Sequence, residues 1–343
     1  MPERAENTRP KTPWDGSIYN LRIVGMGRTS IVFAVDSSRV IKVPIRSSFC
    51  LKAIDQEREV YRRLEKDKSI YVLSCHDPDF SSGILLEKCV GSVRDRLRLM
   101  GQGDGIYPAI GSEHALAHAE RWAYQAAQGL AFVHDHGIIQ ADGKCTSPGI
   151  CAYPRALPPM SLYAERTLSK VGCHNMLLDE QNNLKLADFS GSSIENTNYR
   201  TLVIYDLRSR LSTHNKPDRL SDLFALGCAL YEMAKGHLPY HDLPPKQVQH
   251  CFSHNQYPPL GELRQKVWEV AEAIEGCWNV KTRGGFTSAK DVAAVLKLRY
   301  KSMDEIVGRG HLAKPQWVRV NGYVADPSLL EKEEAQWKPW SFQ

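Results

Sequence analysis

The sequence predicts an α+β protein, and three observations support this fold class. Strand-like segments gather between residues 18 and 90, around one amphipathic helical segment. Helical segments with apolar residues three and four positions apart follow, between residues 115 and 298. The 343 residues are enough for one large two-lobed domain, or for two small domains, with a sizeable core.

Composition and charge exclude several classes of protein. Hydrophobic residues make up 42% of the chain and charged residues 24%, as in ordinary globular proteins. The net charge of +5 is too small to indicate nucleic-acid binding, and no apolar run approaches the ~18 residues of a membrane span. The 9 cysteines lack C-x-x-C spacing, which indicates a reducing compartment. Residues 1 to 17 are polar and predicted to be disordered, and they lack the apolar core of a signal peptide. We therefore expect an intracellular, cytoplasmic protein, and a nuclear location is not excluded.

The first ordered feature is a strand, a glycine-rich turn and a returning strand, from Ile23 to Val35. Gly25 and Gly27 would let backbone N–H groups close over phosphate oxygens, because no Cβ stands in the way. An ordinary hairpin turn is the alternative interpretation. A dinucleotide site is disfavoured, because β-branched residues follow the glycines where such a site needs a helix.

A buried-looking lysine follows in the next strand. Lys42 lies among apolar residues in the predicted strand Arg39–Pro44, and Ala53–Lys66 reads as an amphipathic helix. Glu57 of that helix could turn inward and pair with Lys42, which would hold the ammonium near phosphates. Two further strands are predicted, at Tyr71–Leu73 and Gly83–Glu87.

A second hairpin carries candidate metal ligands. Two short apolar runs flank the polar turn Asp179–Asn183, with Asn175 before the first run and Asp188 after the second. An Asn and an Asp on so small a ribbon can hold a divalent metal through oxygen ligands. Asp142 supplies another carboxylate upstream, after an apolar helix end.

The helical segments account for most of the remaining chain. Asp222 lies in the first turn of one of them, where the helix dipole favours an acidic residue. The predicted helices are Ala115–His134, Leu220–Lys235, Val267–Trp278 and Ser288–Leu298.

Taken together, the order of these motifs resembles the protein kinase family, as a divergent serine/threonine-type or tyrosine-kinase-like domain. The motifs that carry the resemblance are Gly25-x-Gly27-x-x-Ser30-x-Val32, Val40-Ile41-Lys42, Glu57, Asp142, Asn175, Asp188-Phe189, Asp222 to Gly227, and Cys277-Trp278. The resemblance implies a bilobal fold over residues 18–299. A small antiparallel β lobe with one main helix would span residues 18–90, and a larger, mainly helical lobe residues 91–299, followed by a C-terminal tail over 300–343.

The resemblance also implies roles for individual residues. Lys42 would contact the α- and β-phosphates of ATP and pair with Glu57. Asp188 and Asn175 would each hold a Mg²⁺ ion, and Asp142 would orient and deprotonate the acceptor hydroxyl. Asp222 would anchor the backbone around Asp142. The residues implied to bind the nucleotide are Val24, Gly25, Gly27, Val32, Val40, Lys42, Leu86, Glu87, Cys89 and Leu177.

Several positions depart from the family pattern. Gln140 replaces the usual His of the catalytic loop, which alters a spine of packed side chains, and Ala141 replaces the Arg that would bind an activation-loop phosphate. Ser190 stands where Gly is usual, which narrows the freedom of the backbone. The Ala-Pro-Glu motif expected before Asp222 is absent.

The largest departure separates Asp142 from Asn175. About four residues lie between them in the family, whereas Gly143–Lys170 adds 28 residues here, with four prolines and no regular period. Deleting this segment restores the family spacing. Gly143-Lys144-Cys145 can be encoded with GTAAGT, a typical intron start, and Lys170 with an intron end, so we interpret the segment as a retained intron or gene-model error. A genuine inserted loop is the alternative.

The predicted function is that of an ATP-dependent protein kinase using Mg²⁺, with a protein serine or threonine as acceptor. The alternative is a catalytically impaired pseudokinase that acts as a nucleotide-binding or scaffold module, favoured by Gln140, Ser190, the missing Ala-Pro-Glu motif and the long insertion. A small-molecule phosphotransferase of related fold is a third possibility. The expected partners are protein substrates, with neither nucleic acid nor membrane among them.

Overall fold

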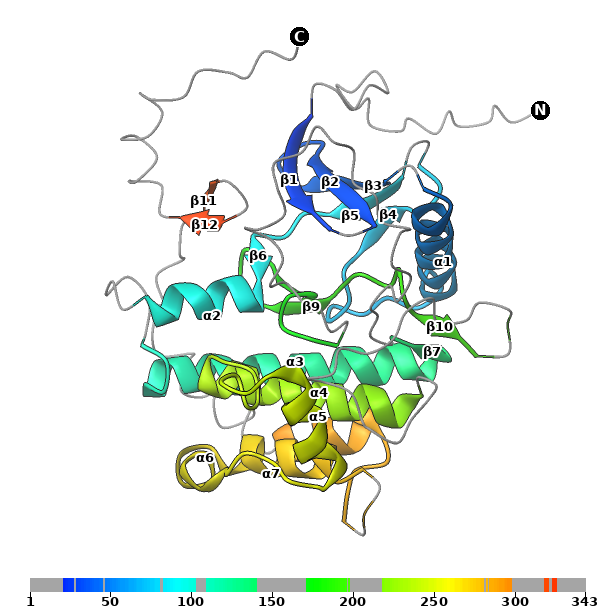
Figure 1. Ribbon diagram of the computed structural model, residues 1–343. Helices are drawn as coiled ribbons and strands as arrows, with labels where there is room; N and C mark the ends of the chain where they lie inside the picture. The colour runs from blue at the N-terminus through cyan, green and yellow to red at the C-terminus, as the bar shows by residue number, and fades with distance from the viewer. Residues whose placement is uncertain are drawn as a thin grey trace, which may run out of the picture.

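The computed structural model describes residues 21–27, 29–45, 47–80, 83–102, 109–140, 171–195, 197, 218–280, 282 and 284–297, with the backbone of 318–320 and 323–325. These residues form a β-rich lobe above a larger helical lobe (Figure 1). The predicted α+β class with two lobes is therefore confirmed. The start at 1–17, the insertion at 143–170 and most of the tail at 300–343 lie outside the described residues.

The small lobe is built on an antiparallel sheet with the order β1-β2-β3-β5-β4. Side chains alternate between its faces: Ile41 and Leu85 pack with Phe33 on one face, and Val40 and Leu86 join the main core on the other. The hairpin around Gly25 and the strand containing Lys42 match the prediction. The strands are β1 (Arg22–Met26), β2 (Ser30–Ala34), β3 (Arg39–Pro44), β4 (Cys75–Asp77) and β5 (Ile84–Glu87).

One predicted strand was wrong. Tyr71–Leu73 does not pair within this sheet, and the edge strand is instead β4. Val72 and Leu73 are buried and face the other lobe, where the Leu73 N–H donates to the carbonyl of Leu186 (2.8 Å). The apolar run therefore joins the two lobes, and the more polar residues after it provide the sheet edge.

The one long helix of the small lobe, α1 (Ser48–Leu64), begins before the predicted start at Ala53. Ser47 caps the helix, because its side chain accepts a hydrogen bond from the Cys50 N–H (3.1 Å). The helix buries the face that carries Glu57 and Tyr61. This face turns the Glu57 carboxylate toward the strand that holds Lys42.

The large lobe is organised around α4 (Arg219–Lys235), which is buried along almost its whole length. Helices α3 (Glu113–Asp135) and α7 (Trp268–Trp278) pack against it, and residues 289–297 are also helical, so the four predicted helices are present. A Cβ at Gly227 would lie 2.7 Å from Cys277 Cβ, so only glycine allows α4 and α7 to approach so closely. The other elements are α2 (Val93–Gly101), α5 (Pro245–Ser253), α6 (Gly261–Lys266), β6 (Gly91–Ser92), β7 (Ile138–Ile139), β10 (Ser193–Ile194), β11 (Val318–Val320) and β12 (Tyr323–Ala325).

The predicted second hairpin consists of β8 (Met176–Leu178) and β9 (Leu184–Leu186). Its turn is closed by a hydrogen bond from the Asp179 N–H to the Asn183 carbonyl (3.0 Å), and Asn182 takes a positive φ of 64°. Asn tolerates this conformation better than most residues with a side chain. The hairpin lies between the two lobes (Figure 1), so residues at its open end face the junction of the lobes.

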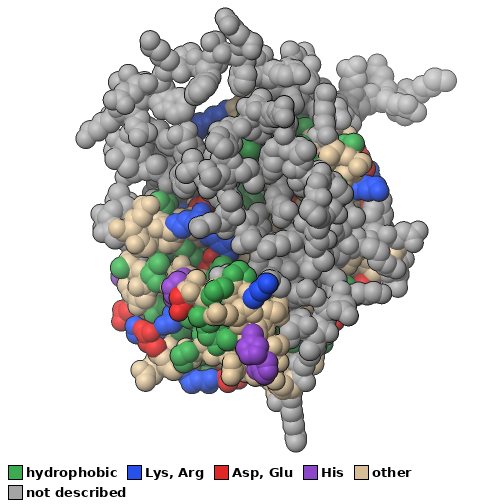
Figure 2. Space-filling view, in the orientation of Figure 1, with side chains coloured by type: hydrophobic (Ala, Val, Ile, Leu, Met, Phe, Trp, Pro, Cys, Tyr) green, Lys and Arg blue, Asp and Glu red, His purple; other side chains and the backbone are tan. Residues whose placement is uncertain are grey.

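The surface of the large lobe mixes side chains of both charges with apolar and histidine side chains on the face shown in Figure 2. Within the part of the chain that the structure describes, no helix combines the length and hydropathy needed to cross a bilayer.

His118 on α3 makes stability depend on pH. Its ring stacks on Trp122, with 5.4 Å between ring centroids, and its Nδ1 lies 3.2 Å from Nδ2 of Asn182. Burial, aided by the positive charges of Arg96 and Arg121, lowers the His118 pKa from 6.5 to about 4. Between these pH values the unfolded chain binds a proton that the folded chain does not. The contribution of neutral His118 to the free energy of unfolding is therefore fully present above about pH 6.5. It is lost as the pH falls toward about 4.

We expect this loss to amount to ~1–2 kcal/mol, because His118 is only half-buried and water screens part of the effect. Urea unfolding of the wild type and of His118→Gln between pH 7 and pH 4 measures it. The free energy of unfolding should fall more steeply for the wild type than for the variant. Parallel curves for the two proteins would contradict the assignment.

Candidate active site

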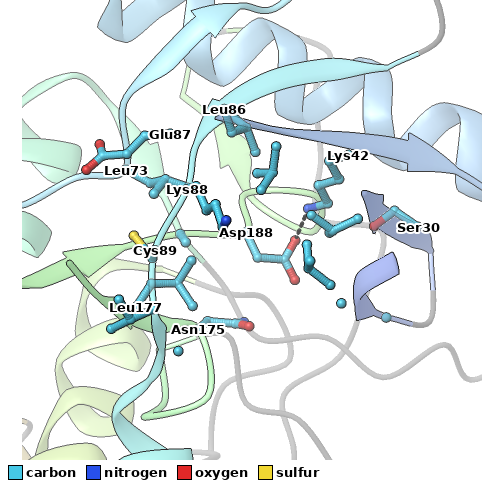
Figure 3. Close-up of a pocket in the computed structure, with 18 of the residues that line it drawn as sticks. Ser30, Lys42, Leu73, Leu86, Glu87, Lys88, Cys89, Asn175, Leu177 and Asp188 are labelled. Atoms are coloured by element: carbon cyan, nitrogen blue, oxygen red, sulfur yellow. Dashed lines mark hydrogen bonds and ion pairs between the residues drawn. The ribbon is translucent and has the colours of Figure 1, made fainter. Parts of the chain in front are cut away.

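A cleft of about 460 Å³ opens between the small lobe and the β8–β9 hairpin, a volume typical of small-ligand sites. Its lining residues come from β1, β2, β3 and β5, from the connection after β5, and from the hairpin and its flanks. Figure 3 shows Lys42 of β3 and Asp188 beside the hairpin facing each other across the cleft. The cleft brings together Lys42, Glu57, Asn175 and Asp188. It also contains every residue expected to bind the nucleotide: Val24, Gly25, Gly27, Val32, Val40, Lys42, Leu86, Glu87, Cys89 and Leu177.

The Lys42 ammonium lies at the centre of the site. It donates hydrogen bonds to Glu57 Oε2 (2.5 Å) and to Asp188 Oδ1 (2.8 Å; Figure 3). Lys42 is 6% exposed and Glu57 is fully buried. Burial alone would lower the pKa of Lys42, but the charges of Asp188 and Glu57 raise it above the ordinary value, so the ammonium stays charged. The predicted ion pair between Lys42 and Glu57 is confirmed.

Neighbouring backbone positions these groups. Gly83, just before β5, lies so close to the Lys42 carbonyl that a Cβ there would come within 2.9 Å of the carbonyl carbon. Only a glycine therefore lets the backbone entering β5 approach β3 this closely. The Phe189 N–H donates to Glu57 Oε1 (3.3 Å), and the buried Phe189 ring meets Tyr61 edge-on at 5.5 Å. Helix α1 is thereby joined to the segment that carries Asp188.

Apolar side chains line the rest of the cleft. Val24, Val32 and Val40 come from the three strands of the small lobe, and Leu177 comes from β8 in the other lobe. Several further lining residues were not expected from sequence. Leu73 reaches the cleft because its segment joins the lobes. The others flank predicted positions and include Met26, Lys88, Val90, His174 and Ala187.

The segment that joins the lobes is held by an ion pair between Lys185 Nζ and Glu87 Oε1 (2.8 Å). Burial alone would raise the pKa of Glu87, but hydrogen bonds from Lys185 and Ser74 lower it below its usual value. The Glu87 N–H donates to the Ser74 carbonyl (3.0 Å) and the Val90 N–H to the Leu178 carbonyl (2.9 Å). These bonds fix the backbone at the edge of the cleft.

Asn175 and Asp188 lie at the open end of the β8–β9 hairpin. The Ala187 N–H donates to the Asn175 carbonyl (2.9 Å), which places Asp188 one residue from this bond. Asp188 itself has a positive φ of 60°. Among the described residues, no three His, Cys, Asp or Glu side chains cluster as a protein-only metal centre would require. An amide and a carboxylate suit Mg²⁺ when substrate phosphates supply the other oxygens.

Asp142 lies outside the described residues, but the chain just before it is firmly held. Gln140 is fully buried, and its N–H donates to Asp222 Oδ2 (2.8 Å). Its side-chain amide donates to the Ala187 carbonyl (3.3 Å), and the Ser192 hydroxyl donates to the Gln140 carbonyl (3.0 Å). The predicted anchoring of this loop by Asp222 is confirmed at Gln140.

Comparison with known proteins agrees with this geometry. Residues 169–289 match the family model described as protein tyrosine and serine/threonine kinase. This part of the chain is therefore similar to protein kinases. The match begins at the end of the segment 143–170 that interrupts the catalytic loop, and it includes both candidate metal ligands of the kinase site, Asn175 and Asp188.

Three similar proteins illustrate the relationship. Serine/threonine-protein kinase 4 homolog B of Dictyostelium discoideum is 27% identical over 256 residues, covering 73% of this chain and 20% of that protein. Cell division control protein 7 of Schizosaccharomyces pombe is 22% identical over 249 residues, covering 71% and 19%. Mitogen-activated protein kinase mpkC of Emericella nidulans is 23% identical over 228 residues, covering 63% and 46%. The chain thus spans about a fifth of the first two relatives.

The departures from the kinase pattern fall partly within the described residues. Gln140 occupies the position of the usual histidine, and its buried Oε1 has no hydrogen-bond partner among the described residues. Ser190 is 4% exposed, and its hydroxyl donates to Asp188 Oδ1 (2.7 Å). Ala141, Gly143–Lys170 and most of the segment before Asp222 in which Ala-Pro-Glu is expected lie outside the described residues.

Replacing Asp222 with alanine is expected to destabilise the kinase fold by ~2–4 kcal/mol. The fully buried carboxylate accepts from the Gln140 N–H and lies 2.9 Å from His134 Nε2, so its loss leaves buried polar groups unpaired. Chemical denaturation measures the change. Asp291→Ala is the matched control, because Asp291 accepts bonds from Thr287 and Ser288 near the surface and should cost ~1 kcal/mol or less. Equal losses for both variants would refute the prediction.

Proposed function

We propose that this protein is an ATP-dependent protein kinase that transfers the γ-phosphate to a protein hydroxyl, with serine or threonine as the expected acceptor. The observation that carries the proposal is the Lys42 ammonium, held between Glu57 and Asp188 inside a cleft of nucleotide size. A fixed cation beside a carboxylate can bind phosphate oxygens and a metal at adjacent points. The name of the Dictyostelium relative, a serine/threonine kinase, favours the choice of acceptor.

The apolar end of the cleft suits an adenine ring. Val24, Val32 and Val40 would cover one face of the ring and Leu177 the other, with Leu86 at the back. The backbone at Glu87 and Cys89 would hydrogen-bond the base edge. The Glu87 N–H already donates to Ser74, so the contribution from Glu87 would come from its carbonyl.

Asp188 and Asn175 would hold the magnesium that accompanies the nucleotide, since both supply oxygen donors beside Lys42. When bound, magnesium neutralises phosphate charge. The protein's own contribution is positioning: Lys42 would hold the α- and β-phosphates, and Glu57 keeps Lys42 in place from its buried side. Asp142 would orient the acceptor hydroxyl and take its proton.

The experiment measures ATP binding and phosphate transfer for the full-length wild type and for Asp188→Asn. Calorimetry with ATP and Mg²⁺ reports binding, and labelled ATP reports both autophosphorylation and transfer to a general protein substrate. We expect transfer by the wild type and a loss of at least about 100-fold in Asp188→Asn. Equal transfer by both proteins would remove the catalytic assignment.

A binding module is the alternative that this experiment separates. ATP binding by the wild type without any transfer would favour the nucleotide-binding scaffold over the enzyme. Transfer to a small molecule but to no protein would favour the related phosphotransferases. We further propose that the partners are protein substrates and do not include nucleic acid or membrane, in keeping with the net charge of +5.

A further inference from the structure

Ser190 makes a contact with Asp188 that a glycine could not make. Its hydroxyl donates to Asp188 Oδ1 at 2.7 Å, whereas its N–H lies 3.4 Å from the same oxygen. The shorter bond is the stronger one, because a hydroxyl that donates to a carboxylate at this distance forms a charge-assisted hydrogen bond. The side chain at this position therefore restrains the candidate metal ligand more than the backbone does.

Besides the bonds from Ser190, Asp188 Oδ1 accepts one from the Lys42 ammonium at 2.8 Å. The proposed role of Lys42 is to bind phosphates, which would draw on the same ammonium. The Ser190 hydroxyl has no such competing role. It can keep Oδ1 fixed when a nucleotide is present, which limits rotation of the carboxylate about its own axis.

The segment around Ser190 is itself well fixed. Ser190 is 4% exposed, and the neighbouring Phe189 is fully buried with its N–H donating to Glu57. The Ser192 N–H donates to the Phe189 carbonyl (3.0 Å), which closes a turn over residues 189–192. The hydroxyl that donates to Asp188 thus belongs to a well-packed turn. Such a fixed hydrogen-bond partner keeps a metal-binding side chain in one orientation.

We propose that Ser190 is a positioning residue that orients the Asp188 carboxylate for a divalent metal bound with the nucleotide. The inference rests on the proposed function, because it assumes that Asp188 binds this metal. It differs from the expectation that serine at this position only narrows the freedom of the backbone. The side chain contributes a supporting hydrogen bond of its own.

The test measures how strongly Mg²⁺ promotes ATP binding. Titration calorimetry gives the ATP affinity at several Mg²⁺ concentrations for the wild type, Ser190→Ala and Ser190→Gly. We expect both variants to need roughly three- to tenfold more Mg²⁺ for the same ATP affinity, as the loss of one charge-assisted hydrogen bond would produce. ATP affinity without Mg²⁺ should stay unchanged, because the hydroxyl binds Asp188 and not the nucleotide.

Ser192→Ala is the matched control, since it removes a buried hydroxyl from the same turn that donates to Gln140 and not to Asp188. The proposal is supported if this control needs the same Mg²⁺ concentration as the wild type for a given ATP affinity, while both Ser190 variants need more. The proposal is overturned if Ser190→Ala needs no more Mg²⁺ than the wild type, or if Ser192→Ala needs as much additional Mg²⁺ as the Ser190 variants. The Asp188→Asn variant distinguishes a failure of the proposed function from a failure of the role given to Ser190. If the wild type shows no more Mg²⁺ dependence than Asp188→Asn, the proposed function fails as well, whereas a defect in Asp188→Asn alone refutes only the role of Ser190.

Discussion

Replacing Lys42 with methionine is expected to reduce phosphate transfer by at least about 100-fold, comparable to the loss of one key donor in other enzymes. Methionine has similar length and keeps the apolar contacts of β3, but it removes the cation that bonds to Glu57 and Asp188. The two carboxylates then face the phosphates without a counter-charge between them. Initial rates of transfer from labelled ATP, measured at saturating ATP, isolate this effect on the chemical step from weaker nucleotide binding.

The same substitution is expected to lower stability by ~2–4 kcal/mol, because Glu57 is fully buried and loses its ion-pair partner. Lys235→Met is the matched control, as Lys235 pairs with the exposed Glu262 (2.6 Å) in the other lobe. The control should keep its transfer rate and lose less than ~1 kcal/mol. A Lys42→Met protein that transfers phosphate at the wild-type rate would contradict the electrostatic role given to this ammonium.

The sequence was sufficient to predict the features that depend on local patterns. The β8–β9 hairpin follows from two apolar runs around Asp179–Asn183, and the first hairpin from its glycines, because alternation and turn residues act over a few positions. The ion pair between Lys42 and Glu57 could be predicted as well, since a helix that follows the strand of Lys42 can turn Glu57 inward toward it. The expected nucleotide-binding residues of the cleft followed from the resemblance to protein kinases.

Features that depend on contacts between distant segments could not be predicted in this way. The run at Tyr71–Leu73 has the composition of a strand, yet its partners lie at Leu186 in the other lobe. Only the folded chain shows that Leu73 therefore lines the cleft. The bond from Ser190 to Asp188 spans only two residues, but it was also missed, because serine at this position was expected to act through the backbone alone.

Deleting residues 143–170 is expected to raise phosphate transfer by roughly 100-fold, because a displacement of about 1 Å at a reacting group can cost this much. Both ends of the interrupted loop are anchored independently. Gln140 is fixed by Asp222 upstream, and Cys173 downstream accepts a bond from the Arg94 N–H (3.0 Å) and donates from Sγ to the Ala229 carbonyl (3.4 Å). The deletion would join Asp142 to Val171 and bring the proposed base to its usual spacing from Asn175.

Two controls show whether spacing is the cause of this increase. Replacing residues 143–170 with a Gly/Ser sequence of equal length should leave transfer low, since it keeps the interruption and changes only its composition. Deletion combined with Asp142→Asn should remove the gain, because the base itself is then lost. If the deletion leaves the rate unchanged, residues 143–170 are compatible with catalysis, and uniform transcripts that encode them would then favour a genuine loop over a retained intron. A gain in the deletion variant alone means that the interruption holds the proposed base away from the site of transfer.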